Sequence, residues 1–261
     1  MIIGIIPARF ASTRLMGKPL ATIGDKPMIQ HTYESAKKSK LIEKLILAVD
    51  DAKVASVARG FGADVIETPK EIASGSDRIA YVAKIYKEAE IIANIQGDEP
   101  FIRGEMIDQA IEPLLFDKSI EVATLIKHIQ TLKELKSPDV VKVVFDYNNY
   151  ALYFSRSPIP YTRIAISDSA ALEITDYYKH IGLYVFRRKA LLKFTGLKQT
   201  DLEKTEMLEQ LRMLENGIRI KVVETEYESI SVDTQEDLKR ARTFYKWLQK
   251  REKENESPSK N

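Results

Sequence analysis

The sequence predicts an α/β protein: a Rossmann-like, mostly parallel sheet with helices on both faces and an antiparallel-rich insertion. Three observations lead to this prediction. The chain opens on the apolar run Ile2–Ile6, ended by Pro7, which is typical of a strand buried on both faces. Strand-like and helix-like segments then alternate to about residue 120, as in crossovers between parallel strands. From about Glu121 to Phe186, strand-like runs follow one another with little helix between them, which indicates antiparallel pairing.

Length and composition restrict the class of protein. A chain of 261 residues, 44% hydrophobic and 30% charged, suits one large α/β domain or one domain with an insertion. Its 40 basic and 38 acidic residues are interleaved, so we expect no nucleic-acid partner. The lack of cysteine excludes disulfides and thiolate ligands, and three scattered histidines do not suggest a zinc site. No apolar run approaches the ~20 residues of a membrane span, so we expect a cytoplasmic protein with no membrane partner.

The elements of the first half follow from hydrophobic spacing. Apolar residues at helical spacing predict a helix at 27–38, which Pro27 can begin because its missing N–H is not needed there. The same reasoning predicts strands at 45–49, 64–67 and 91–95, and helices at 54–61 and 76–86.

The second half has strand-like runs separated by turn signals, at 122–126, 140–145, 151–156, 181–186 and 218–223. Residues Ile164 to Thr175 are small and polar without a period, which predicts a mobile loop. Thr234, with Asp237 three residues later, indicates a capping box that begins the last helix. From about Lys250 the chain is charged and has no apolar residues, so we expect disorder from 250 to 261.

The loop after the first strand collects positive charge. Arg9, Arg14 and Lys18 lie within ten residues, among small residues such as Ala8. A loop at the carboxyl end of a parallel strand is where open α/β sheets bind ligands, and these cations suit phosphate oxygens. The P-loop and dinucleotide fingerprints are both absent. A solvated basic loop is the alternative interpretation.

Two further segments are expected near this loop. Residues 74–78 (SGSDR) predict a helix start with Ser76 as its N-cap. Asp98 follows the strand at 91–95, so its carboxylate would face the same crevice. A triphosphate calls for Mg²⁺, which prefers one or two carboxylates plus phosphate oxygens, so Asp98 is the first candidate ligand and Glu99 the second. A turn role for Asp98 is the alternative.

The motifs Pro7-Ala8-Arg9, Ser12-Thr13-Arg14 and Gly17-Lys18-Pro19-Leu20 resemble the opening signature of the sugar nucleotidyltransferases. Four later stretches are similar to the cytidylyltransferases that activate Kdo, a sugar acid of lipopolysaccharide: 139–144, 150–161, 179–184 and 202–212. The resemblance runs from residue 2 to about residue 242. It implies CTP and a Kdo-type sugar acid as substrates, Mg²⁺ as cofactor and a homodimer.

The resemblance also implies a role for particular residues. The nucleotide would be bound by Ala8, Arg9, Arg14, Lys18, Ser74, Gly75, Asp77, Arg78 and Gln96. Catalysis would rest on Arg14, Lys18 and Asp98, and the metal on Asp98 and Asp233. From the residues alone, Asp233 could equally be the residue that precedes the cap of the last helix.

The sugar acid would be bound by Gln96, Arg156, Arg163, His180, Tyr184, Glu209 and Gln210. Arg156 and Arg163 could fork onto its carboxylate, and the others offer donors and acceptors for hydroxyl groups. Without the resemblance, Arg156 could pair with an acid at a subunit contact, Tyr184 could be core, and Glu209 and Gln210 could form an exposed helix face.

We therefore expect a nucleotide-binding half at 1–120 and an insertion at 121–187 for sugar binding and dimer contacts. Residues 188–249 would return to the core. Ser229-Ile230-Ser231 stand where the resemblance leads us to expect glycine. This difference leaves 8-amino-3,8-dideoxy-Kdo, or another sugar acid, open as the acceptor. A non-catalytic nucleotide-sugar sensor would be expected to lack Lys18 or Asp98, and both are present.

Overall fold

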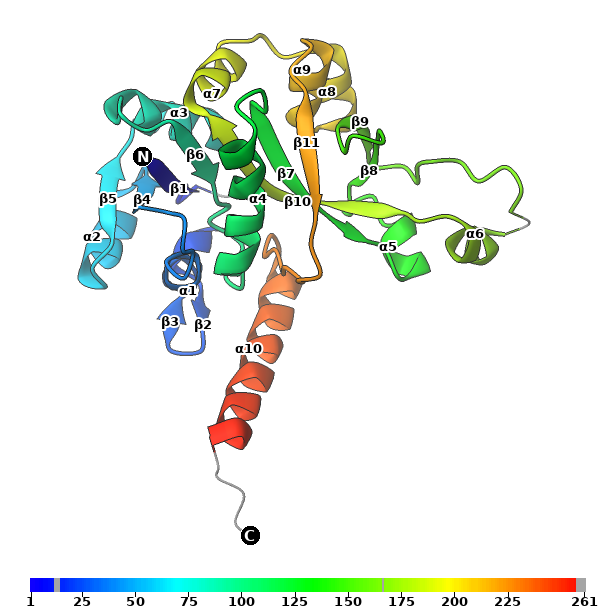
Figure 1. Ribbon diagram of the computed structural model, residues 1–261. Coiled ribbons are helices and arrows are strands. Elements are labelled where there is room, and N and C mark those ends of the chain that lie inside the picture. Colours follow the sequence, from blue (N-terminus) through cyan, green and yellow to red (C-terminus); the bar gives the residue numbers. More distant parts are fainter. Residues whose placement is uncertain (12–14, 166, 257–261) are drawn as a thin grey trace.

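A single mixed sheet organises the computed structural model, which describes residues 1–11, 15–165 and 167–256 (Figure 1). Within these residues the sheet has nine strands, ordered β11-β7-β10-β6-β1-β4-β5, with β8 joined to β10 and β9 to β8. The strands are β1 (Ile2–Ala8), β4 (Lys44–Val49), β5 (Asp64–Glu67), β6 (Ile91–Asn94), β7 (Val122–His128), β8 (Lys142–Phe145), β9 (Ala151–Ser155), β10 (Tyr178–Arg187) and β11 (Ile220–Glu224). A small hairpin pairs β2 (Thr22–Ile23) with β3 (Lys26–Pro27).

The pairing directions confirm the predicted fold class. Strand β1 is parallel to both β4 and β6, β4 is parallel to β5, and β11 is parallel to β7. Strand β10 runs antiparallel to β6, β7 and β8, and β8 runs antiparallel to β9. The parallel part comes from strands joined by helices, whereas the antiparallel part comes from the stretch with little helix.

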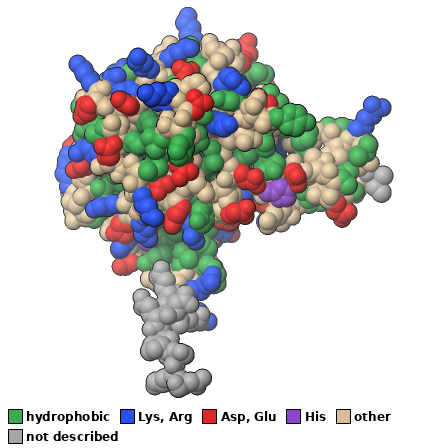
Figure 2. All heavy atoms as spheres, in the orientation of Figure 1, with side chains coloured by type: hydrophobic (Ala, Val, Ile, Leu, Met, Phe, Trp, Pro, Cys, Tyr) green, Lys and Arg blue, Asp and Glu red, His purple; other side chains and the backbone are tan. Residues whose placement is uncertain are grey.

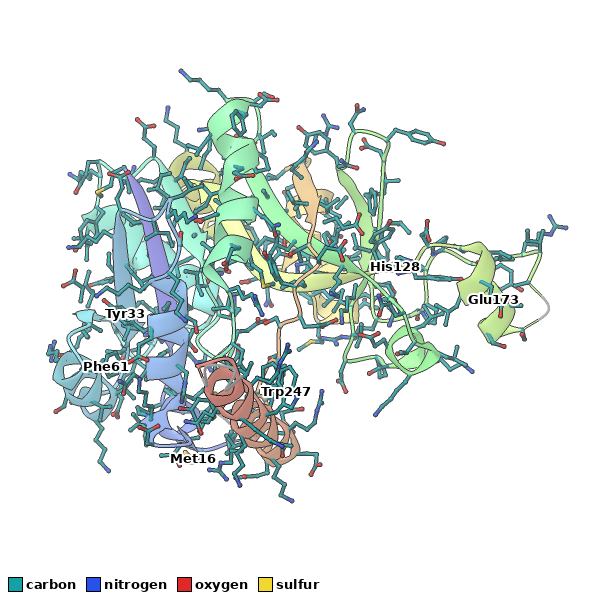
Figure 3. The ribbon with its side chains drawn as sticks, turned by 60° about the horizontal axis from the view of Figure 1, so that its bottom comes forward. Met16, Tyr33, Phe61, His128, Glu173 and Trp247 are labelled. Atoms are coloured by element: carbon teal, nitrogen blue, oxygen red, sulfur yellow. The ribbon has the colours of Figure 1, made fainter. Side chains whose placement is uncertain are left out.

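Helices cover both faces of the sheet, as the sequence predicted. They are α1 (Met28–Ala36), α2 (Ala52–Gly60), α3 (Gly75–Ile85), α4 (Gly104–Phe116), α5 (Leu132–Lys136), α6 (Asp168–Ile174), α7 (Arg188–Thr195), α8 (Asp201–Glu206), α9 (Gln210–Glu215) and α10 (Gln235–Glu256). One apolar core lies under α1, α2 and α4, where Tyr33 packs near Phe61 at 5.7 Å between ring centres (Figure 3). The other lies under α3, α7 and α9. In β1, Ile3 and Ile5 face the second core and Ile6 the first, because side chains alternate along a strand.

The segment from β7 to β10 extends away from the main body as an arm that carries α5 and α6 (Figure 1). Helix α6 shows that the predicted mobile loop is wrong for residues 168–174. Ser167 caps the helix by accepting the backbone N–H of Ala170 at 3.2 Å. Ala171 then packs in a small core with Ile129 and Tyr177. A short helix with one buried turn leaves no long apolar period in the sequence, which explains the error.

Helix α10 runs from Gln235 to Glu256, so the predicted disorder does not begin at residue 250; residues 257–261 lie outside the described part. None of the helices within the described ranges is long and apolar enough to cross a membrane. Basic and acidic side chains are interspersed over the face shown in Figure 2. The limits of the predicted nucleotide half and insertion stay a prediction, because both contribute strands to one sheet.

Candidate active site

The ammonium group of Lys18 joins two carboxylates that are far apart in the sequence. Lys18 Nζ lies 2.6 Å from Asp98 Oδ2 and 2.7 Å from Asp233 Oδ1. The two oxygens are therefore at most about 5.3 Å apart, the sum of these contacts. The structure thus brings together the two residues for which the sequence predicts a shared cation.

Local backbone structure brings the three groups to one point. Lys18 begins a short 3-10 turn after Gly17, whose φ of 66° is in the left-handed region that suits glycine. Asp98 follows β6, the parallel neighbour of β1, and so lies at the carboxyl edge of the sheet. The N–H of Val232 donates to the carbonyl of Asp98 at 2.9 Å, which places Asp233 beside it at the start of α10.

Lys18 is not on a solvated loop, which corrects the alternative interpretation of the basic stretch. Its side chain is only 13% exposed, against 24% for Asp98 and 36% for Asp233. Burial alone would lower the pKa of Lys18, but Asp98 and Asp233 together raise it above its ordinary value. The group is therefore a fixed cation at the sheet edge.

Glu99, the second candidate metal ligand, has a different environment from Asp98. It is buried and accepts a hydrogen bond from the hydroxyl of Ser229. Burial, with the nearby charges of Asp98 and Asp233, raises the pKa of Glu99 to about 8. The neutral form of Glu99 is thus favoured, whereas Asp98 and Asp233 are the two carboxylates that contact the Lys18 ammonium. Within the described ranges, no three His, Cys, Asp or Glu side chains gather into a metal-binding group.

The segment at the start of α3 forms a second part of the site. Ser74, rather than the predicted Ser76, is the N-cap, and its hydroxyl accepts the N–H of Asp77 at 3.0 Å. Ser76 instead donates to Glu209 Oε2 at 2.6 Å, which links the predicted nucleotide side to the predicted sugar side. A side chain at Gly75 would still have ordinary contact distances, so this glycine is not required by space.

Arg78, one of the predicted nucleotide ligands, has a side chain that is already paired within the protein. Its side chain is fully buried and pairs with Asp50 at 3.1 Å, and it also donates to the hydroxyl of Thr68. Burial lowers the pKa of Arg78, against the opposing effect of Asp50. Arg78 therefore stabilises, from the protein interior, the segment that precedes α3. Asp50 was not predicted from the sequence as the partner of Arg78. Asp50 follows a predicted strand, and that position is a signal for a functional carboxylate.

The other nucleotide candidates have varied surroundings. Arg9 is exposed and donates to the carbonyl of Ala73, so it lies beside the start of α3. Ala8 is the buried last residue of β1. Gln96 is half-buried and follows β6, close to where a side chain at Gly182 would be. Arg14 lies outside the described residues.

His180 and Tyr184 form an aromatic pair on β10. His180 Nε2 lies 2.9 Å from the hydroxyl of Thr124, and its ring centre is 5.2 Å from that of Tyr184. Burial lowers the pKa of His180 to about 3, so the ring is neutral. Burial and the charge of Glu209 raise the pKa of Tyr184. Among the described side chains, Tyr184 Oη and Asn94 Oδ1 are buried without a hydrogen bond of normal geometry, and their residues face each other across β10 and β6.

Glu209 and Gln210 do not form an exposed helix face. Gln210 is buried, and Glu209 lies 3.4 Å from Arg212 Nη2 as well as accepting Ser76. Burial raises the pKa of Glu209, with the Ser76 hydrogen bond opposing the shift. The Glu209 side chain therefore lies between α3 and Tyr184 of β10.

The two arginines predicted for the sugar carboxylate have different surroundings. Arg156 donates to the carbonyls of Glu206 at 2.7 Å, Pro138 at 2.8 Å and Met207 at 3.3 Å. This pattern ties β9 to α8 and gives Arg156 a structural role. Arg163 is exposed in the stretch between β9 and α6.

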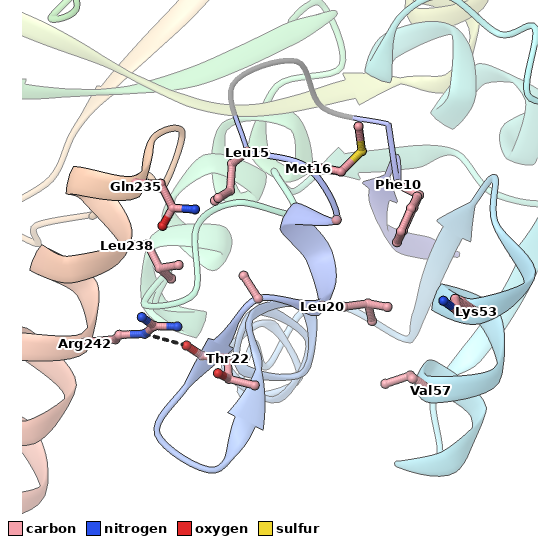
Figure 4. A pocket seen from close by; sticks show the side chains of 12 residues that line it. Phe10, Leu15, Met16, Leu20, Thr22, Lys53, Val57, Gln235, Leu238 and Arg242 are labelled. Atoms are coloured by element: carbon pink, nitrogen blue, oxygen red, sulfur yellow. Dashed lines mark hydrogen bonds between the residues drawn. The ribbon is translucent and has the colours of Figure 1, made fainter.

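An open pocket of about 640 Å³ lies beside the site, between α2, the loop before β2, and α10 (Figure 4). Phe10, Leu20, Val57 and Leu238 supply its apolar wall, and Arg242 at its edge donates to the carbonyl of Thr22 at 2.8 Å. None of the predicted site residues that the structure describes lines this pocket.

The chain is similar to known proteins along most of its length. A family model described as cytidylyltransferase matches residues 3–220. The chain is 51% identical over 243 residues to the 3-deoxy-manno-octulosonate cytidylyltransferase of Geobacter sulfurreducens, which covers 92% of this chain and 97% of the relative. It is 48% identical over 245 residues to the same-named protein of Trichlorobacter lovleyi, with 92% and 97% covered.

Solved structures show the same fold. A CMP:2-keto-3-deoxy-manno-octonic acid synthetase complexed with CTP superposes with a TM-score of 0.88 at 39% identity, covering 95% of this chain and 99% of the other. A 4-diphosphocytidyl-2C-methyl-D-erythritol synthase from Anaerococcus prevotii, at 18% identity and a TM-score of 0.61, shares the fold alone. The family resemblance seen in the sequence is thereby confirmed: this chain belongs to the cytidylyltransferase family.

Proposed function

We propose that this protein transfers CMP from CTP to the anomeric hydroxyl of Kdo, giving CMP-Kdo and pyrophosphate for lipopolysaccharide synthesis. The observation that carries the proposal is the meeting of Lys18, Asp98 and Asp233 at the carboxyl edge of a parallel sheet. Relatives that span nine-tenths of the chain at about half identity are named for this activity.

The reaction exchanges a phosphoanhydride bond of CTP for a phosphodiester bond to the sugar. The anomeric oxygen of the sugar forms a bond to the α-phosphorus of CTP, the bond from that phosphorus to the α–β bridging oxygen breaks, and the hydroxyl proton passes to solvent. Lys18, with Arg9 and Arg14 as the predicted companions, neutralises the triphosphate and the charge that develops on pyrophosphate. A preorganised cation is effective here because it needs no reorganisation as the charge moves.

The residues present fit Mg²⁺. Asp98 and Asp233 already share one cation, the Lys18 ammonium, and two carboxylates are the number that Mg²⁺ commonly takes from protein beside substrate phosphates. When bound, Mg²⁺ would supply positive charge at the α-phosphate and make the attacking hydroxyl more acidic. Asp98 and Asp233 would hold the ion, and the raised pKa of Glu99 beside them favours its neutral form.

For the sugar acid, we propose contacts with Gln96, His180, Tyr184, Glu209 and Gln210. Support comes from the buried Tyr184 hydroxyl beside neutral His180, because it has no hydrogen bond of normal geometry and a sugar hydroxyl would supply one. The base would lie against residues 74–78, where Ser76 connects to Glu209. We also propose a homodimer through the arm, and a cytoplasmic location that gives access to CTP.

The 8-amino analogue of Kdo is the second candidate acceptor, favoured by Ser229, whose hydroxyl contacts Glu99 beside the carboxylate pair. The test is pyrophosphate release from CTP with Kdo, 8-amino-3,8-dideoxy-Kdo or N-acetylneuraminate. We expect release with Kdo and at least tenfold less with the other acids. A higher rate with the 8-amino sugar would replace the acceptor, and no release with any acid would contradict the proposed function.

A further inference from the structure

Asp237 contributes more to the start of α10 than a helix cap requires. It is the third helical residue, and its Oδ2 accepts the N–H of Thr234 at 3.0 Å and the hydroxyl of Thr234 at 2.8 Å. The Thr234 hydroxyl in turn accepts the N–H of Asp237 at 3.2 Å. These contacts complete a capping box.

A further hydrogen bond lies outside the box. The same Oδ2 of Asp237 accepts the N–H of Asp233 at 3.2 Å, one residue before the cap. Asp233 is the residue whose carboxylate meets Lys18. The contact therefore fixes the backbone that carries a site carboxylate, which a helix start does not need.

The backbone on the other side of Asp233 is fastened too. Val232 is fully buried in a core with Met28 and Leu238, and its N–H donates to the Asp98 carbonyl at 2.9 Å. Asp233 is thus held between a bond to the Asp98 backbone and a bond to the Asp237 side chain. Arg240 Nη1, 3.3 Å from Asp237 Oδ1, holds that carboxylate in turn.

We propose that Asp237 is a positioning residue, which orients Asp233 so that its carboxylate and that of Asp98 bind one divalent cation together. This inference rests on the proposed function, because it takes the carboxylate pair to be the cation site. Groups that orient metal ligands commonly change metal affinity 10- to 100-fold when they are removed.

Two variants separate positioning from capping. Asp237→Ala removes the acceptor for Asp233, whereas Thr234→Ala removes the cap hydroxyl and leaves that acceptor in place. Asp237→Asn keeps an oxygen at the same position without the charge. Mn²⁺ affinity is measured on each folded protein in the presence of CTP by electron paramagnetic resonance, and the melting temperature is measured beside it.

We expect Asp237→Ala to bind Mn²⁺ about tenfold more weakly than the parent. The Mn²⁺ affinity of Thr234→Ala should stay within about threefold of the parent, although its melting temperature should fall by about as much as that of Asp237→Ala. The Mn²⁺ affinity of Asp237→Asn should recover most of the parent's value. Should Asp237→Ala not fold, Asp237→Ser replaces it with the same expectation, because the shorter side chain also lacks Oδ2. Parent-like affinity in Asp237→Ala, or equal losses in both alanine variants, would overturn the positioning role. If the parent itself binds no Mn²⁺ in the presence of CTP, the proposed metal site is wrong, and the positioning role of Asp237 is wrong with it.

Discussion

Replacing Lys18 by methionine should strengthen metal binding to the free protein while it weakens catalysis. In the structure, the Lys18 ammonium lies between the carboxylates of Asp98 and Asp233, at 2.6 and 2.7 Å. A divalent cation that enters before CTP must displace this ammonium. When CTP is present, its phosphates offer Lys18 new partners, so metal and nucleotide should bind together.

The size of the effect follows from the two contacts. A hydrogen bond between charged groups contributes ~1.5–3 kcal/mol, so the pair contributes ~3–6 kcal/mol at most. Because Asp233 is 36% exposed, solvent screening reduces this figure, and we take about half of it. Since 1.4 kcal/mol corresponds to a factor of ten, Lys18→Met should bind Mn²⁺ ~10- to 100-fold more tightly than the parent without CTP.

The assay is a Mn²⁺ titration by electron paramagnetic resonance, with and without CTP, and turnover measured beside it. Turnover should fall ~100- to 1,000-fold, as expected when a charge-stabilising donor is lost. Lys26→Met is the matched control, since Lys26 also makes a 2.7 Å ion pair, with Glu34, and neither quantity should change there. Unchanged or weaker Mn²⁺ binding by Lys18→Met without CTP would refute the reasoning.

Three further predictions concern the base, the carboxylates and pH. CTP should be preferred ~10- to 100-fold over UTP in pyrophosphate release, because leaving a buried polar group unpaired costs ~1–3 kcal/mol. ATP should be inactive, and equal rates with ATP and CTP would contradict the prediction. Asp98→Asn and Asp233→Asn should each nearly abolish turnover, and the double variant should be little worse; additive losses would show separate roles. Because the pKa of Glu99 is raised from 4.5 to about 8, the folded protein holds a proton there that the unfolded chain loses. Urea unfolding should thus show stability falling from pH 5 to pH 8 by up to ~1.4 kcal/mol per pH unit more than in Glu99→Gln; identical slopes would exclude the shift.

The sheet could be predicted because its central strands are short apolar runs. Strands β1, β4 and β6 lie where buried runs precede turns, and the change to antiparallel pairing follows the loss of helix from the sequence. Helix α4 is absent from the prediction, although Met106, Ile107 and Ala110 have helical spacing and are buried. Pro113 within that helix weakens the local signal.

The site could be predicted only in part. Asp98 is placed by a general property of parallel sheets, and Asp233 by resemblance, and the structure brings both to Lys18. The burial of Arg78 could not be predicted, because it depends on Asp50, whose pairing is set by tertiary structure. The carbonyl partners of Arg156 could not be predicted for the same reason, since they belong to other elements, and its role toward the sugar stays a prediction.

The central claim is that the anomeric oxygen of the sugar attacks the α-phosphorus of CTP in the site built around Lys18, Asp98 and Asp233. It is tested most directly with Kdo that carries ¹⁸O in its anomeric hydroxyl, using mass spectrometry and ³¹P NMR of the products. The account predicts that the label is retained in CMP-Kdo, at the oxygen between sugar and phosphorus, and that pyrophosphate is unlabelled. Label in pyrophosphate, or a sugar nucleotide without label under conditions where Kdo keeps it, would contradict the account.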